Sequence, residues 1–212
     1  MQPYVNSQDY FSYKMKYTLN VQSVCDYSGK FIDVDIRWPG ATHDAKVFSY
    51  SSIYRVLKEE TQPYLCRTLL PGRDKVGLLL LGDPAYPLLP YIMKEYATCT
   101  TDAEVLFNQM LRDARNAIEC AYGRLKERWQ ILTMPINFKL QDVQSIILAC
   151  FVLHNWCERH SVGIDDAAVL QQIQQDSLMQ PSRAVERRYT YTSSEGRNIR
   201  NIIKDYFSEL AD

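Results

Sequence analysis

The sequence predicts a mixed α/β fold, and three patterns along its 212 residues support that class. Apolar and polar residues alternate along both arms of the segment 17–38, which is the period of antiparallel β-strands. An uninterrupted apolar run at 76–81 is typical of a strand buried on both faces of an α/β sheet. Two longer segments, 103–131 and 143–156, carry apolar residues at the three-or-four spacing of helices.

The first predicted element is the β-hairpin at 17–38. Its second arm places Ile32 and Val34 on one face and Asp33 on the other. Between the arms stands the turn sequence Asp-Tyr-Ser-Gly, which ends at Gly29, a residue free to adopt positive φ. The alternation on both arms predicts two antiparallel strands.

A helix and a buried strand are predicted next. Residues 44–57 carry four candidate core residues at helical spacing: Val47, Ile53, Val56 and Leu57. The buried strand at 76–81 follows and stops at the sequence GDPAYP, residues 82–87.

The remaining elements are predicted to be helices. Thr101 and Glu104 have the spacing of a capping box at the start of the helix 103–131. Gly123 lies inside this helix, where glycine costs about 1 kcal/mol of helix stability relative to alanine. Close packing against a strand, for which a side chain would leave no room, would explain a glycine at this position. A second helix follows at 143–156. Beyond it, we expect a mobile polar segment around the glutamines at 171–175 and at Pro181-Ser182, and then a terminal amphipathic helix near 199–210.

Composition narrows the classes of protein. Lys and Arg number 24 against 25 Asp and Glu, so the net charge of −1 gives no sign of an autonomous nucleic-acid-binding domain. The longest apolar run is far shorter than the roughly 20 residues of a membrane-spanning helix, so no membrane association is expected. The N-terminus has no signal-peptide pattern, and the six cysteines show no zinc-like spacing. Reduced, buried thiols in an intracellular compartment are therefore expected.

Asp83 is the first candidate for chemistry. It directly follows the predicted buried strand, and α/β proteins bind their ligands at the carboxyl ends of such strands. Gly82 allows close approach of a ligand or of backbone, and Pro84 fixes the exit of the chain. The alternative is an aspartate that only helps the turn to leave the strand.

Glu119 and Asp44 are the other acidic candidates. Glu119 lies at the edge of the buried face of its predicted helix, four residues after Arg115, so a structural ion pair is the alternative. Asp44 could instead cap the helix that follows it, as could Thr42. His43 has no accompanying nucleophile pattern, and His154 on an apolar helix is expected to be a satisfied core histidine.

The acidic candidates gain weight when they are taken together. Carboxylates from a strand end and a facing helix can hold Mg²⁺ or Mn²⁺, which prefer oxygen ligands. Two such ions activate water and stabilise the leaving oxygen in phosphodiester cleavage.

Four ordered sequence blocks carry a resemblance to a known family. They are YTLNVQSVCD (17–26), WPGATHDAKVF (38–48), GDPAYP (82–87) and ARNAIECAYGRLK (114–126). In these blocks the chain resembles the nuclease domain of Harbinger-type DDE transposases and the Harbinger transposase-derived nucleases of animals, over about 150 residues from Tyr10 to Cys157.

The resemblance implies an RNase H-like α/β fold, divalent-metal dependence and DNA as the substrate. It places an RNase H-like DDE nuclease domain, a mixed sheet flanked by helices, at 1–160, and a polar linker with a C-terminal helix at 161–212. Asp83 matches the second catalytic aspartate and Glu119 the catalytic glutamate, and Asp44 matches a further acidic position that would contact the metal. The cofactor implied is Mg²⁺ or Mn²⁺.

The sequence departs from the family at its start. Family members carry the first catalytic aspartate in a D-G-T-H-like block upstream of the hairpin, and this chain has no such block. The resemblance therefore predicts that a metal ligand and the central first strand of the sheet are missing. Three aspartates outside the motif are weak substitutes: Asp9, Asp33 and Asp35.

Partners and location are also expectations from the family. Family members rely on a separate Myb-like protein for DNA recognition and nuclear import, which implies a nuclear location, alone or together with the cytoplasm. Two alternatives to an active endonuclease remain. One is an inactive DNA- or protein-binding module of transposon origin, which a local charge of +4 at 183–204 slightly favours. The other is a longer working protein that carries the aspartate upstream.

Overall fold

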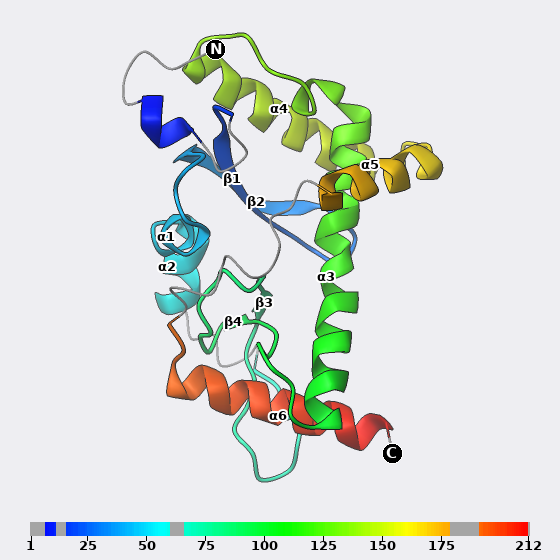
Figure 1. The fold of residues 1–212 in the computed structure, drawn as a ribbon. Coiled ribbons are helices and arrows are strands. Elements are labelled where there is room, and N and C mark those ends of the chain that lie inside the picture. The colour runs from blue at the N-terminus through cyan, green and yellow to red at the C-terminus, as the bar shows by residue number, and fades with distance from the viewer. Residues whose placement is uncertain (1–6, 12–15, 60–65, 179–190, 212) are drawn as a thin grey trace. The chain divides into compact units, whose positions relative to one another are not determined.

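The chain forms two compact units, which we describe separately. The computed structural model describes residues 7–11, 16–59, 66–178 and 191–211 (Figure 1). Unit 1 comprises Met1–His43 and Asn116–Pro181, and unit 2 comprises Asp44–Arg115 and Ser182–Asp212. The long helix α3 (Asp102–Arg128) contributes its first part to unit 2 and its remainder to unit 1.

The predicted hairpin is confirmed in unit 1. Strands β1 (Leu19–Cys25) and β2 (Phe31–Pro39) pair antiparallel, after a short 3-10 helix at Ser7–Tyr10. In the turn, an Asp26 carboxylate oxygen accepts hydrogen bonds from the backbone N–H groups of Ser28 at 2.9 Å and Lys30 at 3.0 Å. Gly29 has a φ of 80°, the left-handed conformation that glycine adopts without strain.

The helices of unit 1 cover this hairpin. The second part of α3 ends at Arg128, a 3-10 turn follows at Gln130–Leu132, and α4 (Leu140–Arg159) packs against β2, so the predicted helix at 143–156 is confirmed. Phe31 lies between them, with its ring centroid 4.5 Å from that of Phe151. The buried residues of this core are Phe31, Ile36, Ala121, Leu125, Ile147, Cys150 and Phe151.

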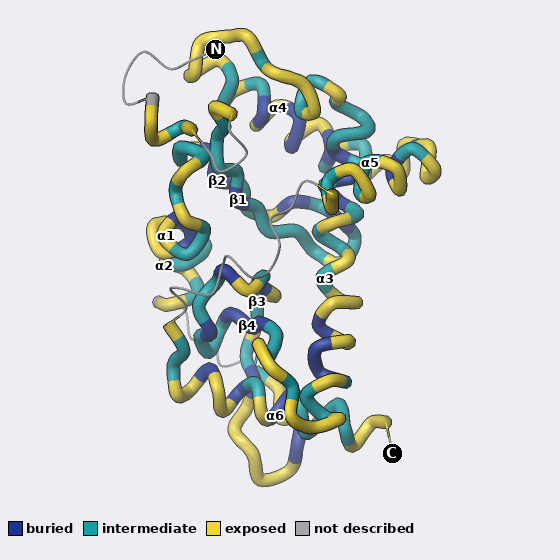
Figure 2. Tube along the Cα trace, viewed as in Figure 1, coloured by how far each residue is buried: buried dark blue, intermediate teal, exposed yellow. Residues whose placement is uncertain are grey.

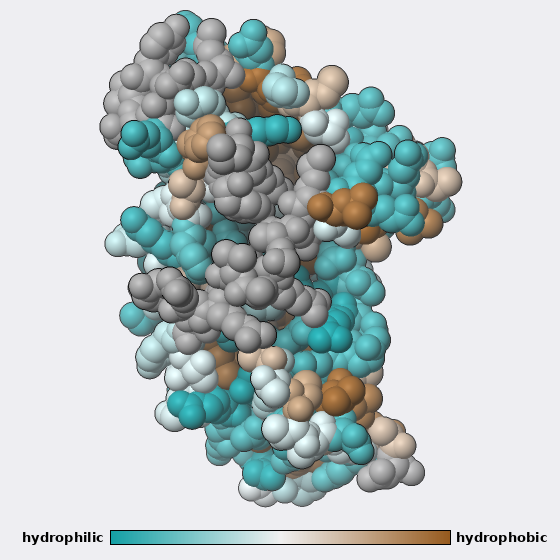
Figure 3. Space-filling view, in the orientation of Figure 1, coloured by the Kyte–Doolittle hydropathy of each residue, from teal (hydrophilic) through white to brown (hydrophobic). Residues whose placement is uncertain are grey.

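Helix α5 (Asp166–Leu178) corrects one expectation and explains a glycine. Residues 171–175, predicted to be mobile, lie within this helix, while the second part of that prediction, Pro181-Ser182, falls outside the described residues. A Cβ atom on Gly123 would come within 2.7 Å of Cγ1 of Ile173. Gly123 therefore permits close packing against a helix, and the prediction that it packs against a strand was wrong. The face of α5 shown in Figure 3 is mainly hydrophilic.

His154 is a buried core histidine, as predicted. Its side chain is fully buried, and its Nε2 lies 2.9 Å from the carbonyl oxygen of Gly29. Its Nδ1 lies 3.4 Å from a guanidinium nitrogen of Arg128. Glu158 forms ion pairs with Arg128 at 2.5 Å and with Arg124 at 3.2 Å. The buried histidine and the charged residues around it are therefore partners of one another.

Unit 2 begins with two short helices where one was predicted. They are α1 (Asp44–Ser49) and α2 (Ser52–Glu59), and the helical conformation is interrupted between them, at Tyr50 and Ser51. The hydroxyl of Ser51 accepts a hydrogen bond from the N–H of Tyr54 at 3.1 Å, which caps the new helix. This local side-chain bond competes with continuation of the first helix.

The predicted buried strand is shorter and more exposed than expected. Only β3 (Leu80–Leu81) forms, and it pairs in parallel with β4 (Ile92–Met93). Val76 is buried, but Leu78 is 60% exposed and Leu81 is 40% exposed, so the run is not buried on both faces. Apolar content alone therefore overstated both the length and the burial of this strand.

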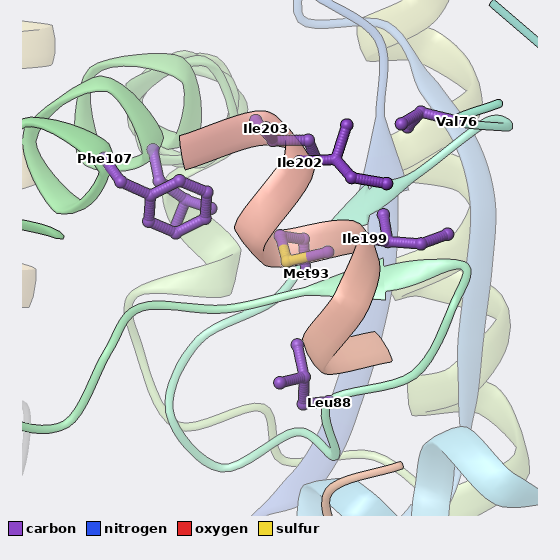
Figure 4. Close-up of a cluster of buried hydrophobic side chains, with 8 residues drawn as sticks. Val76, Leu88, Met93, Phe107, Ile199, Ile202 and Ile203 are labelled. Carbon is purple, nitrogen blue, oxygen red and sulfur yellow. The ribbon is translucent and has the colours of Figure 1, made fainter. Parts of the chain in front are cut away.

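The core of unit 2 lies between its strands and two helices. Helix α3 begins at Asp102, and the Thr101 hydroxyl accepts from the N–H of Glu104 at 3.3 Å as the capping box predicts. The Glu104 carboxylate bonds the N–H of Thr100 at 2.7 Å. The terminal helix is confirmed as α6 (Ser194–Ala211), whose isoleucines pack against Met93 and Phe107 (Figure 4). The buried residues are Val76, Leu88, Met93, Phe107, Leu111, Ile199, Ile202 and Ile203.

The mixed α/β class is confirmed, whereas an RNase H-like core stays a prediction. The described strands form one antiparallel and one parallel pair, and helices supply most of the buried residues (Figure 2). All six cysteines are free, but only Cys150 is buried; the other five are half-buried, so the expectation of buried thiols was wrong for those five. No helix among the described residues is long and apolar enough to cross a membrane.

Candidate functional site

Asp83 lies where the parallel strands of unit 2 end. The N–H of Gly82 donates to the carbonyl of Met93 at 2.8 Å, which extends the pairing to the residue before Asp83. A Cβ atom on Gly82 would come within 3.0 Å of Tyr86, so the missing side chain permits the tight turn. The Asp83 carboxylate then accepts a hydrogen bond from the N–H of Ala85 at 2.8 Å. These contacts hold Asp83 at the carboxyl end of β3.

The surroundings of Asp83 disfavour its charged form. Burial raises the pKa of the Asp83 carboxyl above its usual range, and the negative charge of Asp44 adds to that rise. The hydrogen bond from Ala85 and the positive charges of Arg115 and Lys94 act in the opposite direction. An acidic group at a strand end with a perturbed pKa is a candidate functional group with a physical reason behind it.

Asp44 belongs to the same unit and lies close enough for its charge to act on Asp83. It is the first residue of α1, which starts at the residue after unit 1 ends. Two of the three candidate carboxylates thus lie in the same unit, within range of each other's charge. The family resemblance, rather than the sequence spacing, had already grouped these two residues.

Glu119 lies in the other unit, on the part of α3 that belongs to unit 1. Its side chain is exposed, so the prediction that it sits at the edge of a buried face is not matched. Arg115, one helical turn earlier, belongs to unit 2, where its charge acts on Asp83. The catalytic assignment of Glu119 stays a prediction.

The three weak substitutes for the first aspartate lie in unit 1. Asp35 is held by Arg37 through an ion pair of 2.6 Å, and hydrogen bonds from Arg37 keep the pKa of that carboxyl below its usual range. Burial and the charge of Asp35 raise the pKa of Asp33. Asp9 is exposed in the 3-10 helix. The carboxylate of Asp35 is therefore already paired with Arg37.

Sequence reasoning missed Lys94, which directly follows β4. Its residue is 8% exposed, and its ammonium donates to the carbonyl of Pro84 at 3.3 Å. Burial, and then the charge of Arg200, lower the pKa of Lys94 to about 8, while the charge of Asp83 opposes this change. Because β3 and β4 are parallel, Lys94 and Asp83 leave the same edge of the pair. No sequence signal marks Lys94, since a lone lysine is common on surfaces.

Arg200 of α6 was also missed. Its guanidinium lies 3.8 Å from the centre of the Tyr96 ring, and it donates to the carbonyl of Glu95 at 3.4 Å. Burial lowers the pKa of Arg200. The carboxamide of Asn108 binds both the N–H of Tyr96 at 2.8 Å and its carbonyl at 3.0 Å, so the segment that Arg200 contacts is fixed to α3.

Donor chemistry at Asp44 and Asp83 fits a divalent cation. Two carboxylates that repel each other in a half-buried setting would be stabilised by a positive ion, and carboxylate oxygen is the ligand that Mg²⁺ and Mn²⁺ prefer. Among the described residues no group of three or more His, Cys, Asp or Glu side chains is close enough to hold a metal. The pair therefore fits in donor type but not in ligand number.

Comparisons with known proteins point to one family. Residues 2–155 match the family described as DDE superfamily endonuclease. The chain is 28% identical to "Protein ALP1-like" of Arabidopsis thaliana over 162 residues, which cover 74% of this chain and 39% of that protein. It is 27% identical to the human protein "Putative nuclease HARBI1" over 164 residues, which cover 75% of this chain and 43% of that protein.

The chain thus matches less than half the length of these two relatives. No solved structure matches it. The matched region contains Asp44, Asp83 and Glu119, and it covers well over half of the chain. The chain therefore belongs to the DDE superfamily endonuclease family, as its resemblance to Harbinger-type DDE transposases predicted.

Proposed function

We propose that this chain is a transposase-derived, divalent-metal-dependent DNA endonuclease domain that hydrolyses phosphodiester bonds or transfers strands. The observation that supports this most directly is the placement of Asp83. It lies at the carboxyl end of a parallel strand pair, with Asp44 close enough to raise its pKa. Family membership supplies the reaction class, and the name of the human relative points the same way.

Each acidic residue has a role in this proposal. Asp44 and Asp83 would hold Mg²⁺ or Mn²⁺ through carboxylate oxygens, and the family resemblance assigns Glu119 as the catalytic glutamate and a further metal ligand. The bound metal would supply Lewis-acid activation of water and stabilisation of the leaving oxygen. The Asp83 carboxylate is fixed by the N–H of Ala85, which limits its rotation before any ligand binds.

Partners and location follow from the same family. We propose DNA as the substrate, a Myb-like protein as the partner that recognises the target sequence, and the nucleus as the site of action. The net charge of −1 is compatible with targeting by a partner, because it supplies little general attraction for DNA.

Nicking of supercoiled plasmid DNA by the purified chain tests the proposal. We expect Mn²⁺-dependent nicking that is lost in Asp83→Asn and in Glu119→Gln and weakened in Asp44→Asn. Asp113→Asn is the matched control, because Asp113 is an exposed carboxylate of α3 outside the candidate set. Calorimetric titration with Mn²⁺ measures metal binding separately, and Asp83→Asn should weaken it.

A second function, an inactive DNA- or protein-binding module of transposon origin, is favoured by one observation. Among the described residues no three-ligand metal group is assembled. A chain that neither nicks DNA nor binds Mn²⁺, and yet binds DNA in EDTA, would support this second function and contradict the first.

A further inference from the structure

Two buried or half-buried cations of unit 2, Lys94 and Arg200, have no ion-pair partner in the part of the chain that the structure describes. Lys94 and Arg200 are each bonded to a backbone carbonyl, Lys94 to that of Pro84 and Arg200 to that of Glu95. Neither forms an ion pair with a carboxylate of the described residues. A buried cation is normally paired, so this arrangement needs an explanation.

Two exposed arginines of the same unit are paired with carboxylates. Arg112 is paired with Glu95 at 2.7 Å, and Arg73 is paired with Asp205 at 3.0 Å. The carboxylate of Glu95 therefore faces Arg112, while only its carbonyl faces Arg200. The carboxylate of Glu95 is thus already used, and Asp83 and Glu104 act on the two cations through space without forming an ion pair with either.

The donors of the pair are fixed but incompletely used. The guanidinium of Arg200 lies over the face of the Tyr96 ring, and Asn108 binds both the N–H and the carbonyl of Tyr96. The Nε–H of Arg200 is buried and has no hydrogen-bond partner in the part of the chain that the structure describes. A guanidinium held in place by its neighbours and an ammonium within range of its charge are the kinds of donor that bind phosphate oxygens.

We propose that Lys94 and Arg200 form a phosphate-binding site that contacts a backbone phosphate of DNA beside Asp83. The position is suited to this role, because Lys94 and Asp83 leave the same edge of the parallel strands. The ammonium also contacts the carbonyl of Pro84, the residue next to Asp83. A phosphate bound there would lie next to the carboxylate of the candidate site. This inference rests on the proposed endonuclease function for its choice of DNA as the ligand.

Fluorescence anisotropy with a labelled DNA duplex in EDTA tests the site without cleavage. Lys94→Met and Arg200→Met should each weaken binding by roughly tenfold at ~0.1 M salt and reduce the slope of log affinity against log salt by about 1. Arg73→Met is the control, because Arg73 is an exposed cation of the same unit that has its own ion pair. It should leave both quantities unchanged. Wild-type affinity and slope in Lys94→Met would overturn the proposal.

A second set of measurements separates binding from folding. Lys94→Arg should restore DNA affinity, and the melting temperature of Lys94→Met should not fall below that of the wild type. Lost affinity with a lower melting temperature and no rescue by Lys94→Arg would assign Lys94 a structural role and overturn the proposal. The proposal would also be overturned if ³¹P spectra showed binding of inorganic phosphate while Lys94→Met bound DNA with wild-type affinity.

The outcome is independent of the nicking assay. A chain that binds DNA through Lys94 and does not nick fails only as a nuclease. A chain that nicks, and whose Lys94→Met variant binds DNA as the wild type does, fails only in this inference.

Discussion

Replacing Lys94 with methionine should stabilise the protein at neutral pH. The pKa of Lys94 falls from 10.5 to about 8 because of burial and then the charge of Arg200, so the folded state disfavours the charged lysine. A difference of this size corresponds to about 3 kcal/mol. Loss of the hydrogen bond to Pro84 offsets roughly 1 kcal/mol. The free energy of unfolding should therefore rise by about 2 kcal/mol, since methionine fills similar space without charge.

The pH dependence of this gain has a definite sign. Below pH 8 the lysine is protonated in both states, and the wild type carries the full penalty. As the pH rises from 8 to 10.5, the unfolded chain keeps a proton that the folded chain releases, so the wild type gains stability. The advantage of Lys94→Met should shrink across that window.

Urea unfolding of both proteins across this pH range is the assay. Lys46→Met is the control, because Lys46 is an exposed lysine of α1 and its replacement should change stability by less than about 0.5 kcal/mol. A Lys94→Met variant that is less stable than the wild type at pH 7, or whose advantage does not change with pH, would refute the reasoning.

Four further outcomes are expected. Asp83→Asn should raise the thermal midpoint measured by scanning calorimetry at neutral pH, because burial disfavours the Asp83 carboxylate. The gain should vanish in acid, where the carboxyl is protonated in both the folded and the unfolded chain. Burial lowers the pKa of His154, so the stability of the wild type should fall as the pH drops below about 6.5. In urea unfolding, His154→Gln should make that fall smaller, whereas the control His160→Gln should not. Gly29→Ala should destabilise by more than about 1 kcal/mol, since its φ is 80° and a Cβ would collide with Arg124; an unchanged urea midpoint would contradict this. Phe107→Ala should cost about 3–5 kcal/mol and show as loss of the cooperative melt, because its side chain is fully buried.

Local patterns in the sequence identified most of the elements. The alternation at 17–38 predicted β1 and β2, and helical spacing predicted most of α3, α4 and α6, because those signals depend on neighbours within a few residues. The turn signal before Gly29 and the buried state of His154 also followed from local chemistry. Family resemblance, rather than spacing, raised Asp83 above a simple turn residue.

Other features depend on contacts between distant residues. The short β3 and the helix α5 were not predicted, since each is decided by what the segment packs against. The helix break at Ser51 was also missed, although it depends on a local side-chain bond to Tyr54. Gly123 is an example: only the position of Ile173, fifty residues later, explains it.

The sequence by itself determined the α/β class, the hairpin, the main helices and the family to which the chain belongs. The family resemblance had already grouped Asp44 with Asp83, whereas only the tertiary structure brought Lys94 and Arg200 within range of each other's charge, from a strand end and the terminal helix. The physical reason is range. Hydrogen bonds along a strand or helix are local in sequence, whereas burial and charge act through space between residues far apart in the chain.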